Sequence, residues 1–238
     1  MKMEWTRTDA ARRWIVVSGL VAGPLLAVLS VTVGIGLGGD SMRAQFASMG
    51  AHASTVLTQD VLETAGFVLV LAALAGATGA LRVRGGAFGT VGAALAVVGI
   101  TGFAVSNATG LTVVALAQQP DQDAAFRTAM AVTSQGVLAT AGTLGFALEL
   151  LAQAGMLLVF VGLVRARLAS FWVLPITVLG IAVNAVVGTM TATLVADVLL
   201  LAVCGWTAVR IARCSHQQWL GQSVAAAGAR RVPVPDIA

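Results

Sequence analysis

Charged side chains are scarce in this 238-residue chain, since Asp, Glu, Lys and Arg together make up 10% of it. A soluble domain usually carries about 25% charged and about 45–50% apolar residues, whereas 58% of this chain is apolar. Too few polar side chains are present to cover a water-facing globule. The composition therefore disfavours a soluble enzyme, a disordered chain and a nucleic-acid-binding protein, although the net charge is +4.

Several residue types that carry chemistry in membranes are also missing or misplaced. Lys2 is the only lysine, which excludes a Schiff base inside an apolar segment. His52 and His216 fall outside the apolar runs, so paired-His haem ligation is excluded. Cys204 and Cys214 lack a His partner at the same depth, which disfavours a thiol catalyst or a metal site. We expect no cofactor, no metal and no enzymatic activity.

What the chain does have is long apolar runs. A helix needs about 20 residues to cross the hydrocarbon core of a bilayer. The runs predict an all-α polytopic membrane bundle of six transmembrane helices, at about residues 14–37, 61–80, 87–116, 136–164, 171–188 and 192–211. We expect a retained first helix, kinked at Pro24, in preference to a signal peptide, because the run is much longer than a signal h-region.

Basic residues test this count independently. With both termini cytoplasmic, twelve of the fourteen Lys and Arg residues fall on the inner side, and only Arg43 and Arg127 on the outer side. This split follows the positive-inside rule. Trp14, Trp172 and Trp206 fall near the predicted inner interface, where indoles settle. The absence of Tyr and the Ala, Gly, Val and Arg bias suggest a high-GC bacterium, so the predicted location is the bacterial inner membrane.

The segments between the spans allow more than one interpretation. Met42, Phe46 and Met49 have helical spacing, which predicts either a short surface helix or an ordered loop. Asp121 and Asp123 are better explained as a helix N-cap and first-turn acid than as a cation site. The apolar stretch at 128–164 predicts one helix that starts after Pro120, with its first turns outside the membrane. Residues 188–193 are the expected turn between the last two spans, and residues 214–238 a flexible cytoplasmic tail.

Small residues recur at four-residue spacing in the first three spans, as in Gly19 with Gly23 and Ala72 with Gly76. In lipid, such residues allow close backbone approach between helices. We expect them to pack within the bundle, while contacts to a second copy or to a partner membrane protein remain the alternative.

Polar residues within the spans are the only functional candidates. At about 1.5 Å per residue, Asp197 and Asn184 come out near the midplane, Glu149 somewhat further out, and Glu63 and Asn107 near the outer mouth. Gln153 shares a helix face with Glu149. The sequence thus predicts a ligand or ion pocket that opens outward, formed by Glu149, Asp197, Asn184, Gln153, Glu63 and Asn107.

Intramembrane acids are functional candidates by default, but a neutral carboxyl that hydrogen-bonds a neighbouring helix would serve only structure. The fourth span holds enough Leu, Val and Phe to carry Glu149 without functional compensation. We therefore predict an accessory or binding bundle embedded in the lipid bilayer. The alternative is a transporter of a small solute, cation or proton that uses the intramembrane acids.

The order of features resembles an uncharacterised six-pass bacterial integral membrane family of unknown function. The likeness is carried by Arg12-Arg13 before the first span, Val164-Arg165-Ala166-Arg167 after the fourth, and then Leu174-Pro175 and Leu179-Gly180. Several residues separate the basic turn from the Pro in this chain, which departs from the family pattern. The resemblance implies the six-pass architecture and assigns no catalytic residue.

Overall fold

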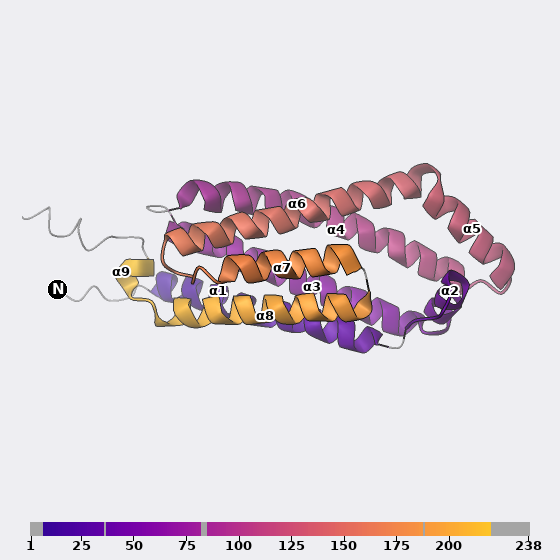
Figure 1. The fold of residues 1–238 in the computed structure, drawn as a ribbon, viewed down its shortest axis with the longest axis horizontal. Helices are drawn as coiled ribbons and strands as arrows, with labels where there is room; N and C mark the ends of the chain where they lie inside the picture. The colour runs from indigo at the N-terminus through magenta and orange to yellow at the C-terminus, as the bar shows by residue number, and fades with distance from the viewer. Residues whose placement is uncertain (1–6, 36, 82–84, 188, 220–238) are drawn as a thin grey trace, which may run out of the picture.

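The structure is a computed structural model that describes residues 7–35, 37–81, 85–187 and 189–219. The regular secondary structure of these residues is helical, and they contain no strand. Six helices run lengthwise through the bundle (Figure 1): α1 (Arg7–Gly34), α3 (Ala53–Ala77), α4 (Gly86–Ala117), α6 (Gly136–Arg165), α7 (Val173–Val187) and α8 (Met190–Arg213). A 3-10 turn, η1 (Thr78–Leu81), extends α3.

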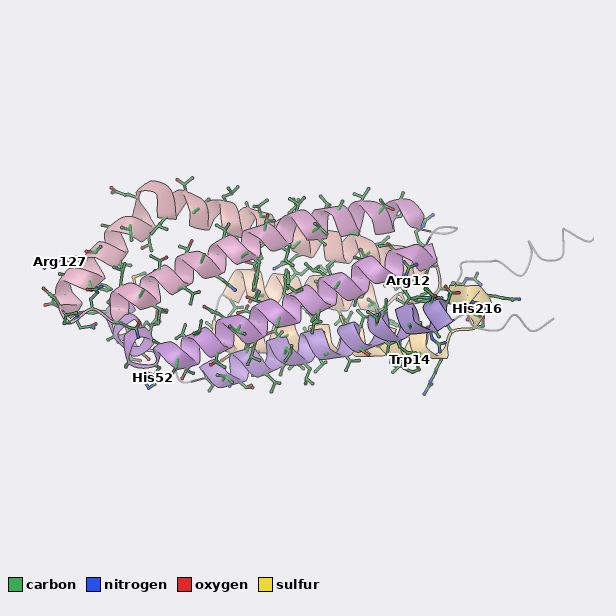
Figure 2. The ribbon with its side chains drawn as sticks, turned by 180° about the vertical axis from the view of Figure 1, so that it is seen from behind. Arg12, Trp14, His52, Arg127 and His216 are labelled. Atoms are coloured by element: carbon green, nitrogen blue, oxygen red, sulfur yellow. The ribbon has the colours of Figure 1, made fainter. Side chains whose placement is uncertain are left out.

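Three shorter helices mark the two ends of the bundle. α9 (His216–Trp219) lies beside the start of α1, while α2 (Met42–Ala51) and α5 (Gln122–Ser134) lie at the opposite end (Figure 1). We call these the α9 end and the α5 end. Figure 2 shows Arg12, Trp14 and His216 at the α9 end and His52 and Arg127 at the α5 end.

Within the described residues, five helices are long and apolar enough to cross a membrane, namely α1, α3 with η1, α4, α6 and α8. α7 is apolar but has only 15 residues, which is about 22 Å of helix. The protein therefore has the architecture of a multi-pass membrane protein. The sequence predicted six spans, and a total of six requires that this shorter helix also crosses the membrane.

The long fourth apolar stretch is two helices rather than the one helix that the sequence predicted. α5 ends at Ser134, Gln135 is extended, and Gly136 begins α6 with a φ of +83°. Glycine adopts this left-handed backbone without the Cβ clash that other residues meet. The expected cap is present, because the Asp121 carboxylate accepts from the Ala124 N–H at 3.0 Å and Asp123 lies in the first turn of α5.

A pair of glycines tests this break. Gly136→Ala should lower the free energy of unfolding by about 1–2 kcal/mol, because a non-glycine residue is strained at positive φ. A Cβ at this position would meet no atom within 4 Å, so backbone strain alone would cause the loss. Gly142→Ala, also in open space but within α6, should gain up to about 1 kcal/mol in helix propensity. Melting temperatures of the two purified variants measure the difference. Equal shifts in the same direction would show that Gly136 is not under conformational constraint.

Glycine faces bring two helix pairs into close contact. A Cβ at Gly23 of α1 would lie 2.7 Å from the Gly66 carbonyl oxygen of α3, and a Cβ at Gly92 of α4 would lie 2.6 Å from the Gly155 carbonyl oxygen of α6. Gly99 continues the α4 face against Ala152. These small residues pack within the bundle, as the sequence predicted.

The apolar core fills the half of the bundle toward the α9 end. Leu20, Leu74, Phe160, Leu163 and Ile211 are fully buried there and come from α1, α3, α6 and α8. A smaller apolar cluster joins α2, α4 and α5 at the other end around Phe46, which confirms a helix rather than a loop for the segment with Met42 and Met49.

The segment after α8 begins as a docked helix. The sequence predicted a flexible tail from residue 214, but Trp219 is buried, and the His216 Nε2 lies 3.4 Å from the Asp9 carboxylate of α1. Arg13 donates to the Cys214 carbonyl at 3.4 Å. Burial raises the pKa of the Cys214 thiol, although the Arg13 guanidinium opposes the shift. The rest of the predicted tail, 220–238, lies outside the described residues, as do Lys2, Arg82 and Arg84.

Candidate functional site: an intramembrane acidic pocket

A cavity of about 100 Å³ lies among all six lengthwise helices, where the apolar core gives way to polar side chains. This volume has room for a few water molecules or a ligand of several heavy atoms. Each helix contributes to the wall. Its polar lining consists of Glu63 (α3), Glu149 and Gln153 (α6), Thr177 and Asn184 (α7), and Thr193 and Asp197 (α8).

Three carboxyl groups from three different helices share this cavity. Glu63, Glu149 and Asp197 are each partly buried. The Glu63 carboxyl lies within Coulombic range of the other two and of Asp60 one turn away on α3. Among the residues that the structure describes, no Lys, Arg or His lines the cavity. The site is therefore acidic, and no basic side chain in its wall balances that charge.

Amides and hydroxyls complete the polar wall. The Thr193 hydroxyl donates to the Asn184 Oδ1 at 3.0 Å, which joins α8 to α7 across their turn. The Gln153 Nε2 donates to the Glu149 carboxylate at 3.5 Å along one face of α6. The Gln153 Oε1 is buried, and no donor among the described residues reaches it. One buried acceptor of a lining residue thus has no donor, and we call it the open acceptor.

Five of the six residues that the sequence proposed for the pocket line this one cavity: Glu63, Glu149, Gln153, Asn184 and Asp197. Asn107 does not. Its Nδ2 donates to the Thr64 hydroxyl at 2.8 Å and ties α4 to α3. Because Asn107 has this partner outside the cavity, its role in the structure is to join two helices.

Sequence reasoning missed two aromatic lining residues and two threonines, Thr177 and Thr193. Phe67 of α3 and Phe103 of α4 stack at 4.9 Å between ring centroids and both line the cavity. Phe67 and Thr193 each stand four residues from a predicted acid, Glu63 and Asp197 respectively, and so share its helix face. That spacing was the signal that could have found them.

The alternative role for the acids, as neutral groups that bond neighbouring helices, predicts hydrogen bonds between helices. Among the described residues, no side-chain hydrogen bond joins Glu63, Glu149 or Asp197 to a different helix. The Glu149 carboxylate accepts one hydrogen bond, from Gln153, and both residues belong to α6. The acids face the cavity instead of a partner helix. This arrangement leaves their oxygens available to a ligand.

Comparison with known proteins adds no relative. No protein-family model matches the chain, and neither a curated protein nor a solved structure is significantly similar to it. Evidence for function therefore comes from the pocket itself.

Proposed function

We propose that this protein is an integral membrane bundle that binds a small cationic solute in its acidic pocket. The supporting observation is that Glu63, Glu149 and Asp197 come from three helices to one cavity whose wall, in the described part of the chain, holds no basic residue. Burying an ionised carboxylate is costly unless an opposite charge accompanies it. A bound cation supplies that charge, whereas an anion would be repelled.

The proposal places the bundle in a bacterial inner membrane with six spans and both termini in the cytoplasm. Arg12 and Arg13 lie near the start of α1, and Arg165 and Arg213 end α6 and α8, all at the α9 end of the bundle (Figure 1). This placement suits the cytoplasmic face under the positive-inside rule. Trp14 and Trp172 are 52% and 71% exposed near the same end, as expected for residues at a membrane interface. α7 is the short fifth span of this proposal and packs against α8, the sixth.

The pocket then opens toward the outer face. Asn184 and Thr193 flank the α7–α8 turn, which lies on the α5 side of the cavity, whereas Val70, Met156 and Leu200 line the cavity nearer the apolar core. A polar ligand that enters from the α5 side meets polar groups, whereas one that enters from the α9 side would have to pass through the apolar core. Access from outside is the less costly route.

Thermal stability of the purified full chain tests binding. A ligand that binds only the folded state stabilises it by about 2.7 kcal/mol at one hundred times its dissociation constant. We therefore expect at least one small cation among sodium, potassium, methylammonium and tetramethylammonium to raise the melting temperature in a saturable manner. Ionic strength and chloride are held constant with N-methylglucamine, a cation too large for the cavity. A flat melting temperature for all four cations would contradict the proposed function.

Transport of the same cation is the second candidate, because ionisable residues within spanning helices often mark pathways for ions and substrates. The acids of this pocket belong to three helices that run the length of the bundle. Proteoliposomes loaded with buffer and exposed to a labelled cation distinguish the two functions. Uptake that saturates indicates transport, while saturable binding without uptake indicates a binding bundle.

A further inference from the structure

The wall of the pocket that carries no charge is aromatic and aliphatic. Phe103 is buried, its ring stacks on that of Phe67, and both rings line the cavity beside Val70, Met156 and Ile176. An aromatic ring attracts a cation through its quadrupole, and the surrounding carbon covers alkyl groups. An inorganic cation gains nothing from the aliphatic part of such a wall, because it requires a shell of oxygen ligands.

The acids are not arranged as the coordination sphere of a metal ion. Within the described ranges, no group of three or more His, Cys, Asp or Glu side chains lies close enough to hold a metal ion. Ca²⁺ needs about six to eight oxygen ligands that converge on one point. The carboxyls of Glu63, Glu149 and Asp197 instead stand on separate helices around the cavity.

The open acceptor at Gln153 narrows the class of cation further. Its Nε2 is directed to Glu149 at 3.5 Å, which fixes the amide so that its buried Oε1 has no donor within the described part of the chain. A buried acceptor without a donor is unfavourable. An ammonium group carries N–H donors for this oxygen and for the carboxylates, whereas a quaternary ammonium carries none.

We infer that the pocket selects a small protonated amine, whose ammonium head donates to the Gln153 Oε1 and to carboxylate oxygen of the pocket and whose short alkyl part lies against Phe67 and Phe103. The inference rests on the proposed function, because it names the class of cation that the pocket binds. A cavity of about 100 Å³ limits the ligand to a few heavy atoms.

Competition on the full chain tests the selectivity. Purified protein in lipid nanodiscs is equilibrated with radiolabelled methylammonium, and ethylammonium, sodium, potassium or tetramethylammonium is added as competitor. We expect ethylammonium to compete at least about tenfold better than each of the other three. Equal or better competition by sodium or tetramethylammonium would overturn the amine assignment and leave the proposed function intact. If methylammonium does not bind and no cation raises the melting temperature, both proposals fail.

A Gln153→Met variant separates the roles of the pocket groups. Removal of the open acceptor should reduce the preference for methylammonium over tetramethylammonium at least about fivefold. Phe103→Leu should weaken ethylammonium more than sodium. Gln118→Met is the matched control, since Gln118 is exposed at the end of α4 and does not line the cavity. An unchanged preference in Gln153→Met, with a normal melting temperature, would refute the role of the amide oxygen.

Discussion

The double variant Glu149→Gln, Asp197→Asn should bind its cationic ligand at least about 100-fold more weakly than the native chain. A hydrogen bond to a charged group contributes about 1.5–3 kcal/mol, and about 1.4 kcal/mol corresponds to a tenfold change in affinity. Each single substitution should therefore cost roughly tenfold or more. Equilibrium binding of labelled methylammonium measures the loss.

Stability distinguishes this loss from misfolding. Both substitutions keep the shape of the side chain and replace a charged group with a neutral one, which lowers the cost of burial. Without ligand, the double variant should melt at the same temperature as the native chain or higher. Asp40→Asn makes the same chemical change at an exposed site far from the cavity lining and should leave binding unchanged. Native affinity in the double variant would remove the acids from the proposed site.

Gly99→Leu should destabilise the bundle by at least about 3 kcal/mol, the upper part of the range for overpacking. A Cβ at Gly99 would overlap the backbone nitrogen, Cα and Cβ of Ala152 on α6. Because these atoms belong to backbone and to the shortest side chain, they cannot move aside by changing rotamer. The helices α4 and α6 would have to separate, and α6 carries Glu149 and Gln153 of the pocket.

Gly110→Leu is the control for this prediction. Gly110 lies on the same helix, yet a Cβ there meets nothing within 4 Å. Leu should be neutral or stabilising at that position, because it forms helices better than Gly by up to about 1 kcal/mol. Melting temperatures and the retention of a monodisperse peak in detergent measure both variants. If the two leucines had equal effects, the α4–α6 glycine contact would not be a determinant of the fold.

Local helix signals were the most predictable part of this protein. The apolar runs indicated where the lengthwise helices lie, the Asp121 cap is present as expected, and the segment with Phe46 is the helix of the two alternatives that its spacing allowed. The break at Gly136 was missed, because a glycine in an apolar run is equally compatible with a continuous helix and with a positive φ. The docking of Trp219 was also missed, because it depends on how far apart the ends of α1 and α8 lie, which the local sequence does not show.

Depth along each helix was enough to predict that acids and amides lie between the midplane and the outer end of the bundle, because the rise per residue of a helix is fixed. Depth does not give the direction in which a side chain points around its helix axis. Asn107 stands at a suitable depth but bonds Thr64, whereas Phe67 and Phe103 face the cavity. The rotation of each helix is set by which small residues meet its neighbours.

The amino-acid sequence alone determined that this chain forms apolar helices of membrane length with acids along them, since hydropathy and helix geometry are local properties. Only the tertiary structure decided that Glu63, Glu149 and Asp197 surround one cavity, that Asn107 stays outside it, and that Gln153 keeps an open acceptor there. The close glycine contacts of α1 with α3 and of α4 with α6 constrain how these four helices are turned toward one another, and such contacts between distant segments are not a local property of the sequence.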